Sequence, residues 1–231
     1  MGTFEFETSN GELFCLAAIQ GFDSLLNVEY EPEETGTDLM VVFNKLTDRL
    51  RNKKWLEEDF DGNMAVSSEM VAAIALCGSA EQFWVIQGHA KRETVADCIY
   101  TVYNAKENYL VLEQLDGESY RGLLTRDRAA LTRTVFAKTP FTPATHTYPK
   151  IIPGELEAIT GREPYALINI SKYTTEAAND ARSLVCLDAA MFLLLDDGGA
   201  YTLSVDEADD GEFIPIDAPA FDQIFMDQEV A

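Results

Sequence analysis

The chain has 231 residues, which suits one large domain or two small ones. Apolar residues make up 47% of it, enough for a hydrophobic core, which argues against intrinsic disorder. The 17 basic and 40 acidic residues give a net charge of −23, which excludes nucleic acid as a general partner because phosphate binding needs a positive surface.

The sequence also predicts a cytoplasmic protein with no membrane partner. No apolar run is long enough to cross a bilayer, and the first residues lack the basic start and apolar stretch of a secretory signal. Each of the four cysteines lies in an apolar run, as is typical of buried thiols in a reducing compartment. They are Cys15, Cys77, Cys98 and Cys186.

In chain order, the first elements are a strand and a helix. Residues 3–7 alternate between apolar and polar side chains, which predicts a short strand. Ser9 and Glu12 have the spacing of a capping box, so a helix is expected to begin there and to end near Gly21.

Two further helices follow, over residues 38–51 and 67–78. The first has Thr37 as its expected cap, an apolar stripe at helical spacing and a basic C-terminal end. The second begins at Ser67 and is expected to end at Gly78. Between them, the spacing of acidic residues 57–63 resembles a calcium loop, but Ser68 stands where the bidentate glutamate belongs. We therefore expect a solvated turn there and no metal.

Residues 81–136 contain a series of short apolar runs that residues 164–226 repeat in the same order. Each run is bounded by turn-forming or charged residues, as in a strand meander. The first series has the runs 83–86, 98–103 and 109–112, then Gly117 with Tyr120 three residues on, and a helix over 125–138. The second has 165–168, 184–187 and 191–195, then Gly198 with Tyr201 three residues on, and a helix over 218–228. The alternative is that any two antiparallel meanders look alike.

We therefore predict an α+β fold with two pseudo-symmetric antiparallel β-meanders flanked by helices, in a single domain of residues 1–231. The first half is 1–138, a proline-rich connector is 139–154, and the second half, which begins with a short helix at 155–160, is 155–231.

Catalytic motifs are absent from the sequence. There is no glycine-rich nucleotide loop, no nucleophile elbow, no zinc-protease motif and no Cys-x-x-Cys pair. His89 and His146 fall in predicted loops, and Cys98 starts an apolar strand, where an inert thiol is favoured over a nucleophile. We expect no enzymatic activity, no cofactor and no metal, although a small enzyme with an unrecognised site is left open.

The order of elements resembles the EspG family. The features that carry this resemblance are the basic-ended helix, Trp55-Leu56, the acidic turn, residues 66–76 and the repeated meander. EspG proteins are cytosolic chaperones of type VII secretion systems, with similar proteins in Gram-positive bacteria. The resemblance covers nearly the whole chain, and it implies a non-enzymatic adaptor that holds a helical secretion substrate or toxin before export.

For the partner-binding surface, the sequence favours the first meander. Trp84 and Ile86 alternate away from the Phe83 face, while Lys91 and Arg92 offer basic groups and Tyr103 ends the neighbouring strand. The alternative is that both faces of the strand are covered internally. Should Trp84 be buried, this assignment fails and the acidic second half becomes the better candidate.

A second class of function fits the same composition. An immunity protein is also small, acidic and free of catalytic motifs, and it would meet a basic toxin through charge steering. From residue 183 to the end there are twelve acidic residues and no Lys or Arg. A homodimer is left open.

Overall fold

The computed structural model describes residues 2–30, 39–58, 62–90, 98–135, 166–177, 183–196, 199–205 and 211–217. The chain divides into two compact units. The first contains residues 1–83 and 101–126, and the second contains residues 84–100 and 127–231. The expected cap at Thr37, the connector 139–154 and the helices at 155–160 and 218–228 lie outside the described residues.

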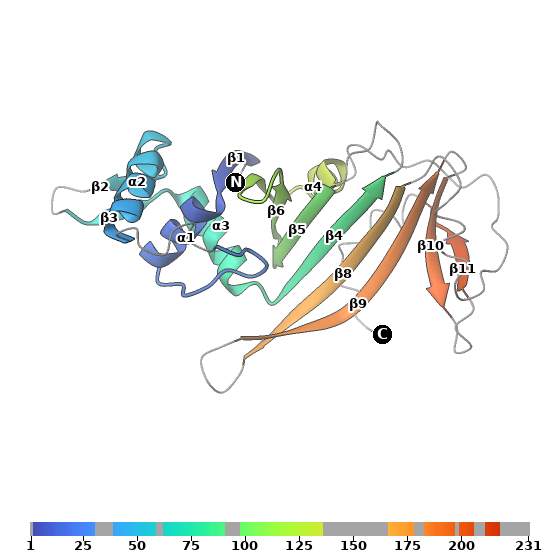
Figure 1. Ribbon diagram of the computed structural model, residues 1–231. Helices are drawn as coiled ribbons and strands as arrows, with labels where there is room; N and C mark the ends of the chain where they lie inside the picture. The colour runs from blue at the N-terminus through green and yellow to red at the C-terminus, as the bar shows by residue number, and fades with distance from the viewer. Residues whose placement is uncertain are drawn as a thin grey trace. The chain divides into compact units, whose positions relative to one another are not determined.

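Two sheets are described. The larger is an antiparallel sheet of nine strands in the order β1-β7-β6-β5-β4-β8-β9-β10-β11, and the smaller is the hairpin β2–β3 (Figure 1). Reading outward from β4 and β8, the consecutive strands β5, β6 and β7 follow on one side and β9, β10 and β11 on the other. With four described helices, this confirms the α+β class with two meanders.

The chain begins with strand β1 (Phe4–Ser9) and helix α1 (Asn10–Ile19). The predicted capping box is confirmed. The Ser9 hydroxyl accepts from the Glu12 backbone N–H at 3.3 Å, and the Glu12 carboxylate accepts from the Ser9 N–H at 3.0 Å. Gly21 follows the helix with φ +81°, a left-handed conformation that glycine adopts without strain.

Helix α2 (Leu39–Asn52) leads into the hairpin of β2 (Leu56–Glu58) and β3 (Met64–Val66), and α3 (Ser68–Ser79) follows. A hairpin thus replaces the simple turn that the sequence predicts. Gly78 is the second-last residue of α3, which ends at Ser79, and the ring of Phe22 packs against it. A Cβ at Gly78 would lie 2.4 Å from the Phe22 ring, so only glycine fits.

The first meander has the predicted strands, each longer than its apolar run. They are β4 (Gln82–Ala90), β5 (Cys98–Ala105), β6 (Asn108–Gln114) and β7 (Ser119–Thr125), followed by α4 (Arg128–Val135). β7 pairs on its other side with β1, where the Phe6 ring lies over Gly122. A Cβ there would lie 2.1 Å from the ring, so the glycine makes room for Phe6.

The second meander differs from its prediction in two strands. It consists of β8 (Ala166–Ala177), β9 (Ser183–Asp196), β10 (Gly199–Val205) and β11 (Gly211–Pro215). The runs 184–187 and 191–195 are one strand, and β8 continues through residues 172–177, well beyond the predicted run 165–168. The physical reason is pairing, because β8 and β9 hydrogen-bond along this length and a bulge at Lys172/Tyr173 absorbs the extra residue.

The run-by-run alignment of the two meanders is therefore wrong. Two of its runs fall on β9, so the strand correspondence supported by the sheet order is β4 with β8, β5 with β9, β6 with β10 and β7 with β11. The division into two halves joined by the connector stays a prediction, because the connector is outside the described residues.

Candidate functional site

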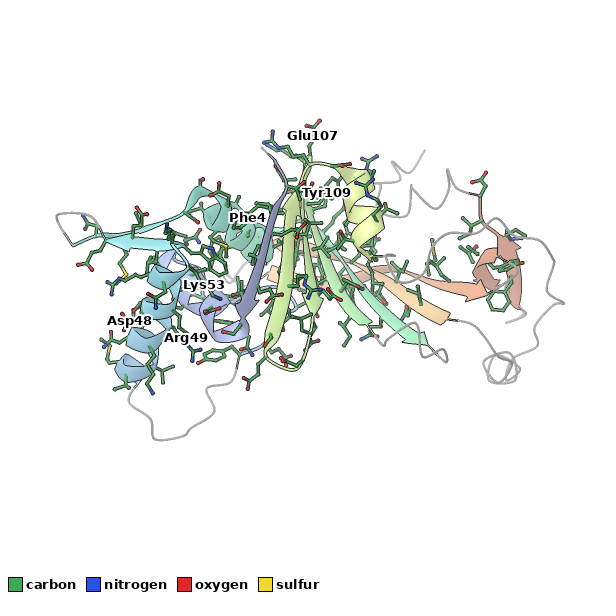
Figure 2. All side chains as sticks on the ribbon, turned by 90° about the horizontal axis from the view of Figure 1, so that it is seen from above. Phe4, Asp48, Arg49, Lys53, Glu107 and Tyr109 are labelled. Carbon is green, nitrogen blue, oxygen red and sulfur yellow. The ribbon has the colours of Figure 1, made fainter. Side chains whose placement is uncertain are left out.

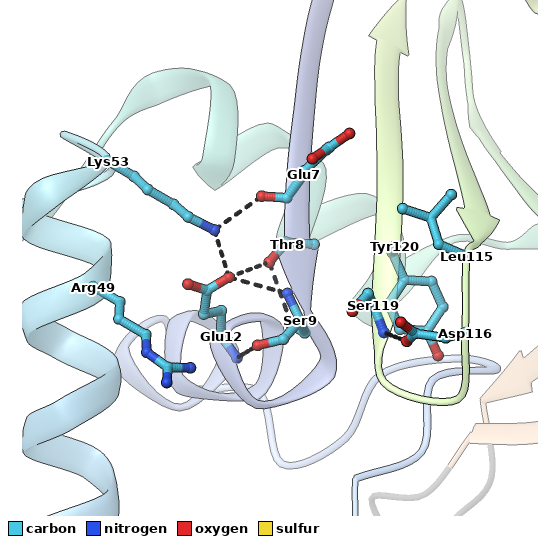
Figure 3. Close-up of a pocket in the computed structure, with 10 residues that line it drawn as sticks. All are labelled: Glu7, Thr8, Ser9, Glu12, Arg49, Lys53, Leu115, Asp116, Ser119 and Tyr120. Atoms are coloured by element: carbon cyan, nitrogen blue, oxygen red, sulfur yellow. Dashed lines mark hydrogen bonds and ion pairs between the residues drawn. The ribbon is translucent and has the colours of Figure 1, made fainter.

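A polar pocket of about 350 Å³ lies in the first unit, where β1, the start of α1, the end of α2 and the turn between β6 and β7 meet (Figure 3). Charged, hydroxyl and apolar groups all contribute to it. The lining residues are Glu7, Thr8, Ser9, Glu12, Arg49, Lys53, Leu115, Asp116, Ser119 and Tyr120. It is thus built from segments that are far apart in the sequence.

Glu12 is the centre of the hydrogen-bond network at one wall of the pocket. Its side chain is 4% exposed, and Oε2 accepts from Ser9 N at 3.0 Å, from Thr8 Oγ1 at 3.2 Å and from Lys53 Nζ at 2.7 Å. A buried carboxylate requires such partners, because an unpaired charge away from water is costly. The same carboxylate therefore caps α1 and binds α2.

Lys53, the first residue after α2, completes this network. Its ammonium also donates to the Glu7 carbonyl at 2.9 Å and lies 4.5 Å from the centre of the Trp55 ring. Trp55 in turn makes an edge-on contact with Phe6, with ring centroids 5.8 Å apart. These contacts hold the end of α2 against β1, so the Lys53–Glu12 pair has a structural explanation.

Arg49 is the cation in the pocket for which no ion pair is found within the described part of the chain. It lies one helical turn before Lys53, on the same side of α2 (Figure 2). The β6–β7 turn opposite contributes Asp116, whose pKa is lowered by the backbone N–H groups of Glu118 and Ser119 that donate to it. Arg49 and Asp116 therefore place one positive and one negative group in the pocket lining, and together they could bind a small polar molecule.

No reacting pair of side chains is found in this pocket. The pKa of Tyr120 is raised, first by burial and then by the nearby Glu29 and Cys77, so its hydroxyl stays protonated. Among the described residues, no group of three His, Cys, Asp or Glu side chains is close enough to hold a metal ion.

Three of the predicted partner-binding residues were expected to be exposed, but the structure shows them buried. Trp84, Ile86 and Tyr103 are 2%, 1% and 0% exposed, and Phe83 on the other face of β4 is 3% exposed. Both faces of this strand are therefore buried, which was the alternative, and none of these side chains is available as a surface anchor in this conformation. No measurement tests their role in binding.

Lys91 and Arg92, the other two predicted partner-binding residues, lie outside the described residues. Their assignment stays a prediction.

Tyr103 has a structural role instead. Its hydroxyl donates to the carbonyl of Leu26, and its ring lies 6.0 Å from that of Phe83. The neighbouring Asn27, with φ +53°, donates its side-chain amide to Thr101 Oγ1 at 2.8 Å. Tyr103 and Thr101, both on β5, therefore hold the loop that follows α1 in place.

The two described thiols near this region, Cys15 and Cys77, are buried. Burial raises the pKa of Cys77, whose backbone carbonyl accepts from Leu26 at 2.8 Å. Burial and the Glu12 carboxylate raise the pKa of Cys15 to about 11. Both thiols therefore stay protonated at neutral pH and behave as small apolar groups, as the sequence predicts.

The pocket itself was missed by the sequence analysis. The capping box identifies Glu12, and the four-residue spacing of Arg49 and Lys53 places them on one side of a helix. Nothing in the local pattern brings the 115–120 turn to the same place, because that depends on the pairing of β1 with β7.

Comparison with known proteins gives a likeness in structure alone. No family model and no curated protein sequence matches the chain. A solved structure of the Mycobacterium tuberculosis type VII secretion system chaperone EspG5, in complex with the PE25–PPE41 dimer, is similar with a TM-score of 0.60 and 9% identity. The likeness covers 95% of this chain and 93% of that chain, so the two share a fold.

None of the helices in the described ranges combines the length and the apolar character needed to cross a bilayer.

Proposed function

We propose that this chain is a non-enzymatic, cytoplasmic chaperone or adaptor that binds a protein client exported by a type VII secretion system. The observation that carries the proposal is the extent of the structural likeness. It covers 95% of this chain and 93% of EspG5, so it extends well beyond a single shared motif.

Two properties of the chain support a binding role. In the polar pocket, Lys53 and Glu12 form a structural ion pair, and the lining offers no nucleophile with a base. The net charge of −23 keeps the chain soluble and favours a basic partner, because opposite charges accelerate association. By analogy with the complex of EspG5 with a PE25–PPE41 dimer, the proposed client is a secreted protein, and we expect it to be helical.

The proposal is tested by co-expression. Each predicted helical secreted protein encoded near this chain is produced alone and together with the full chain, and its soluble fraction is measured. We expect the client to be largely insoluble alone and to co-elute with this chain in size-exclusion chromatography with light scattering. An unrelated protein of similar size and net charge serves as the control, because it separates specific binding from general charge effects. If no client becomes more soluble or co-elutes, the chaperone proposal is wrong.

One observation favours a second candidate, an immunity protein. The segment from residue 183 to the end carries twelve acidic residues and no Lys or Arg, as expected of a surface that meets a basic toxin domain. The two functions differ in their readout. An immunity protein abolishes the activity of a purified toxin domain at equimolar concentration, whereas a chaperone keeps its client soluble and leaves any toxin activity after release.

A further inference from the structure

Strand β9 extends beyond the strand that follows it in the sheet. β8 pairs with β9 along the whole of β8, from Ala166 opposite Leu195 to Ala177 opposite Ser183. β10 pairs with β9 only between Leu193 and Asp196, and Figure 1 shows β10 turning away while the β8–β9 ribbon continues. In the described part of the chain, the outer edge of β9 before Leu193 therefore has no strand partner. Such an edge presents backbone N–H and C=O groups that a further strand can pair with.

The exposed end of this edge carries large apolar side chains. Val185 and Leu187 are 44% and 59% exposed, and alternation along the strand places both on one face. Their cross-strand neighbours are Thr175 and Tyr173, so this face of the ribbon combines apolar and hydroxyl groups. β9 contains no Pro, Lys or Arg, the residues that commonly protect an open edge from added strands.

The charge next to this edge is negative. Asp188, beside Leu187, is 46% exposed although it pairs with Lys172 at 3.2 Å. From residue 183 onward the chain has no basic residue, and the whole chain carries −23. A second copy of the chain would bring another −23 to the same edge, so charge repulsion opposes a homodimer formed there.

We propose that the open edge of β9, residues 183–188, binds an extended segment of a partner protein as an added strand, and that this segment alternates apolar with basic residues. Apolar side chains at every second position match the spacing of Val185 and Leu187, which is about 6.8 Å in an antiparallel strand. Basic residues between them match Asp188 and the negative charge of the chain. Backbone hydrogen bonds supply affinity in this mode, and the alternating side chains supply specificity.

The inference rests on the proposed function only for the identity of the partner, which would then be the secreted client. The surface itself follows from the strand pairing, the exposure and the charge. A synthetic peptide therefore tests the surface without a client.

The probe is a fluorescein-labelled peptide of alternating valine and lysine, titrated with the full chain and followed by fluorescence anisotropy. We expect saturable binding that weakens as salt is raised, because salt screens exposed charges. Two peptides serve as matched controls. One has glutamate in place of lysine, and the other is N-methylated at every second residue, which removes the donors along one edge. Each is expected to bind at least about tenfold more weakly.

Protein variants test the location. V185E and L187E are expected to reduce binding of the valine–lysine peptide about tenfold or more each, because each places a carboxylate against the valine side chains of the peptide, where its loss of hydration outweighs its attraction to the lysines on the other face. V71E is the matched control, since Val71 on α3 is 41% exposed and lies in the first unit. Circular dichroism and the urea midpoint confirm that each variant is folded. A folded L187E chain that binds as the unmodified chain does contradicts the inference.

Other outcomes also decide the question. Equal binding of the N-methylated peptide excludes an added strand, and equal binding of the glutamate peptide excludes the charge argument. A dimer in light scattering that L187E dissociates means that a second copy occupies the edge, which also overturns the inference.

If a client binds and V185E and L187E leave its affinity unchanged, the edge is not its site although the chaperone function stands. If the peptide binds but no client is found, the proposed function fails and the surface stands.

Discussion

Replacement of Glu12 by alanine is the sharpest test of how the first unit is held together. The change removes one carboxylate that is 4% exposed and that accepts from Thr8, Ser9 and Lys53. Loss of a helix cap costs about 1 kcal/mol, and breaking a buried ion pair costs about 3–5 kcal/mol. Because the Lys53 side chain is 36% exposed and can turn to water, we expect the pair to contribute less than this range, about 2 kcal/mol, which with the cap gives about 3 kcal/mol in total.

The assay is equilibrium unfolding in urea, followed by circular dichroism and tryptophan fluorescence. E12A is expected to lower the unfolding midpoint with little change in slope. E5A is the control, because Glu5 on the neighbouring strand β1 is exposed, and we expect it to change the free energy of unfolding by less than about 0.5 kcal/mol. A double-mutant cycle with E12Q and K53M isolates the pair, and a coupling of about 1–2 kcal/mol is expected.

The reasoning is refuted if E12A unfolds within 0.5 kcal/mol of the unmodified chain, a limit of about the size expected for exposed sites. That outcome would mean that Glu12 and Lys53 are solvated and that the network does not join α1 to α2. A large effect of E12A with no coupling in the cycle would instead assign the loss to the capping box alone.

Three further predictions follow from the packing. G78A is expected to destabilise the chain by about 1–3 kcal/mol through overpacking against Phe22, although alanine favours helices, and F22A should remove most of this penalty in the double variant, as urea unfolding would show. If G78A is stabilising by itself, the close contact is wrong. Y103F is expected to cost about 1 kcal/mol and to speed amide exchange in the loop around Leu26, because its hydroxyl bond is lost; unchanged exchange there would contradict this role. The pKa of Cys15 rises from 9.0 unfolded to about 11 folded, so its contribution to stability is complete below pH 9 and is lost as pH rises through about 11. The loss of stability in that window should be smaller in C15A, and equal slopes for the two chains would count against a buried thiol.

Local signals in the sequence determined much of the first unit. The Ser9–Glu12 spacing set the start of α1, because a capping box is made by residues three apart. The apolar stripe and basic end of residues 38–51 set α2, and the short apolar runs set the strands of the first meander. The order in which the helices and strands follow one another along the chain was sufficient to predict the α+β class.

Other features depended on contacts between distant residues, so only the tertiary structure decided them. Asp188 and its neighbours interrupt the apolar pattern, yet β9 runs through them because β8 pairs alongside and the Lys172–Asp188 pair compensates for the charge. Gly78 looks like a helix end in the sequence, and only the tertiary structure shows that the Phe22 ring leaves no room for a Cβ at this position. Residues 83–86 are apolar on both faces of the strand, which left open whether one face meets a partner, and the burial of both faces was decided by what packs on the sheet. Alternation records which side a residue points to, and the rest of the fold decides whether that side meets water.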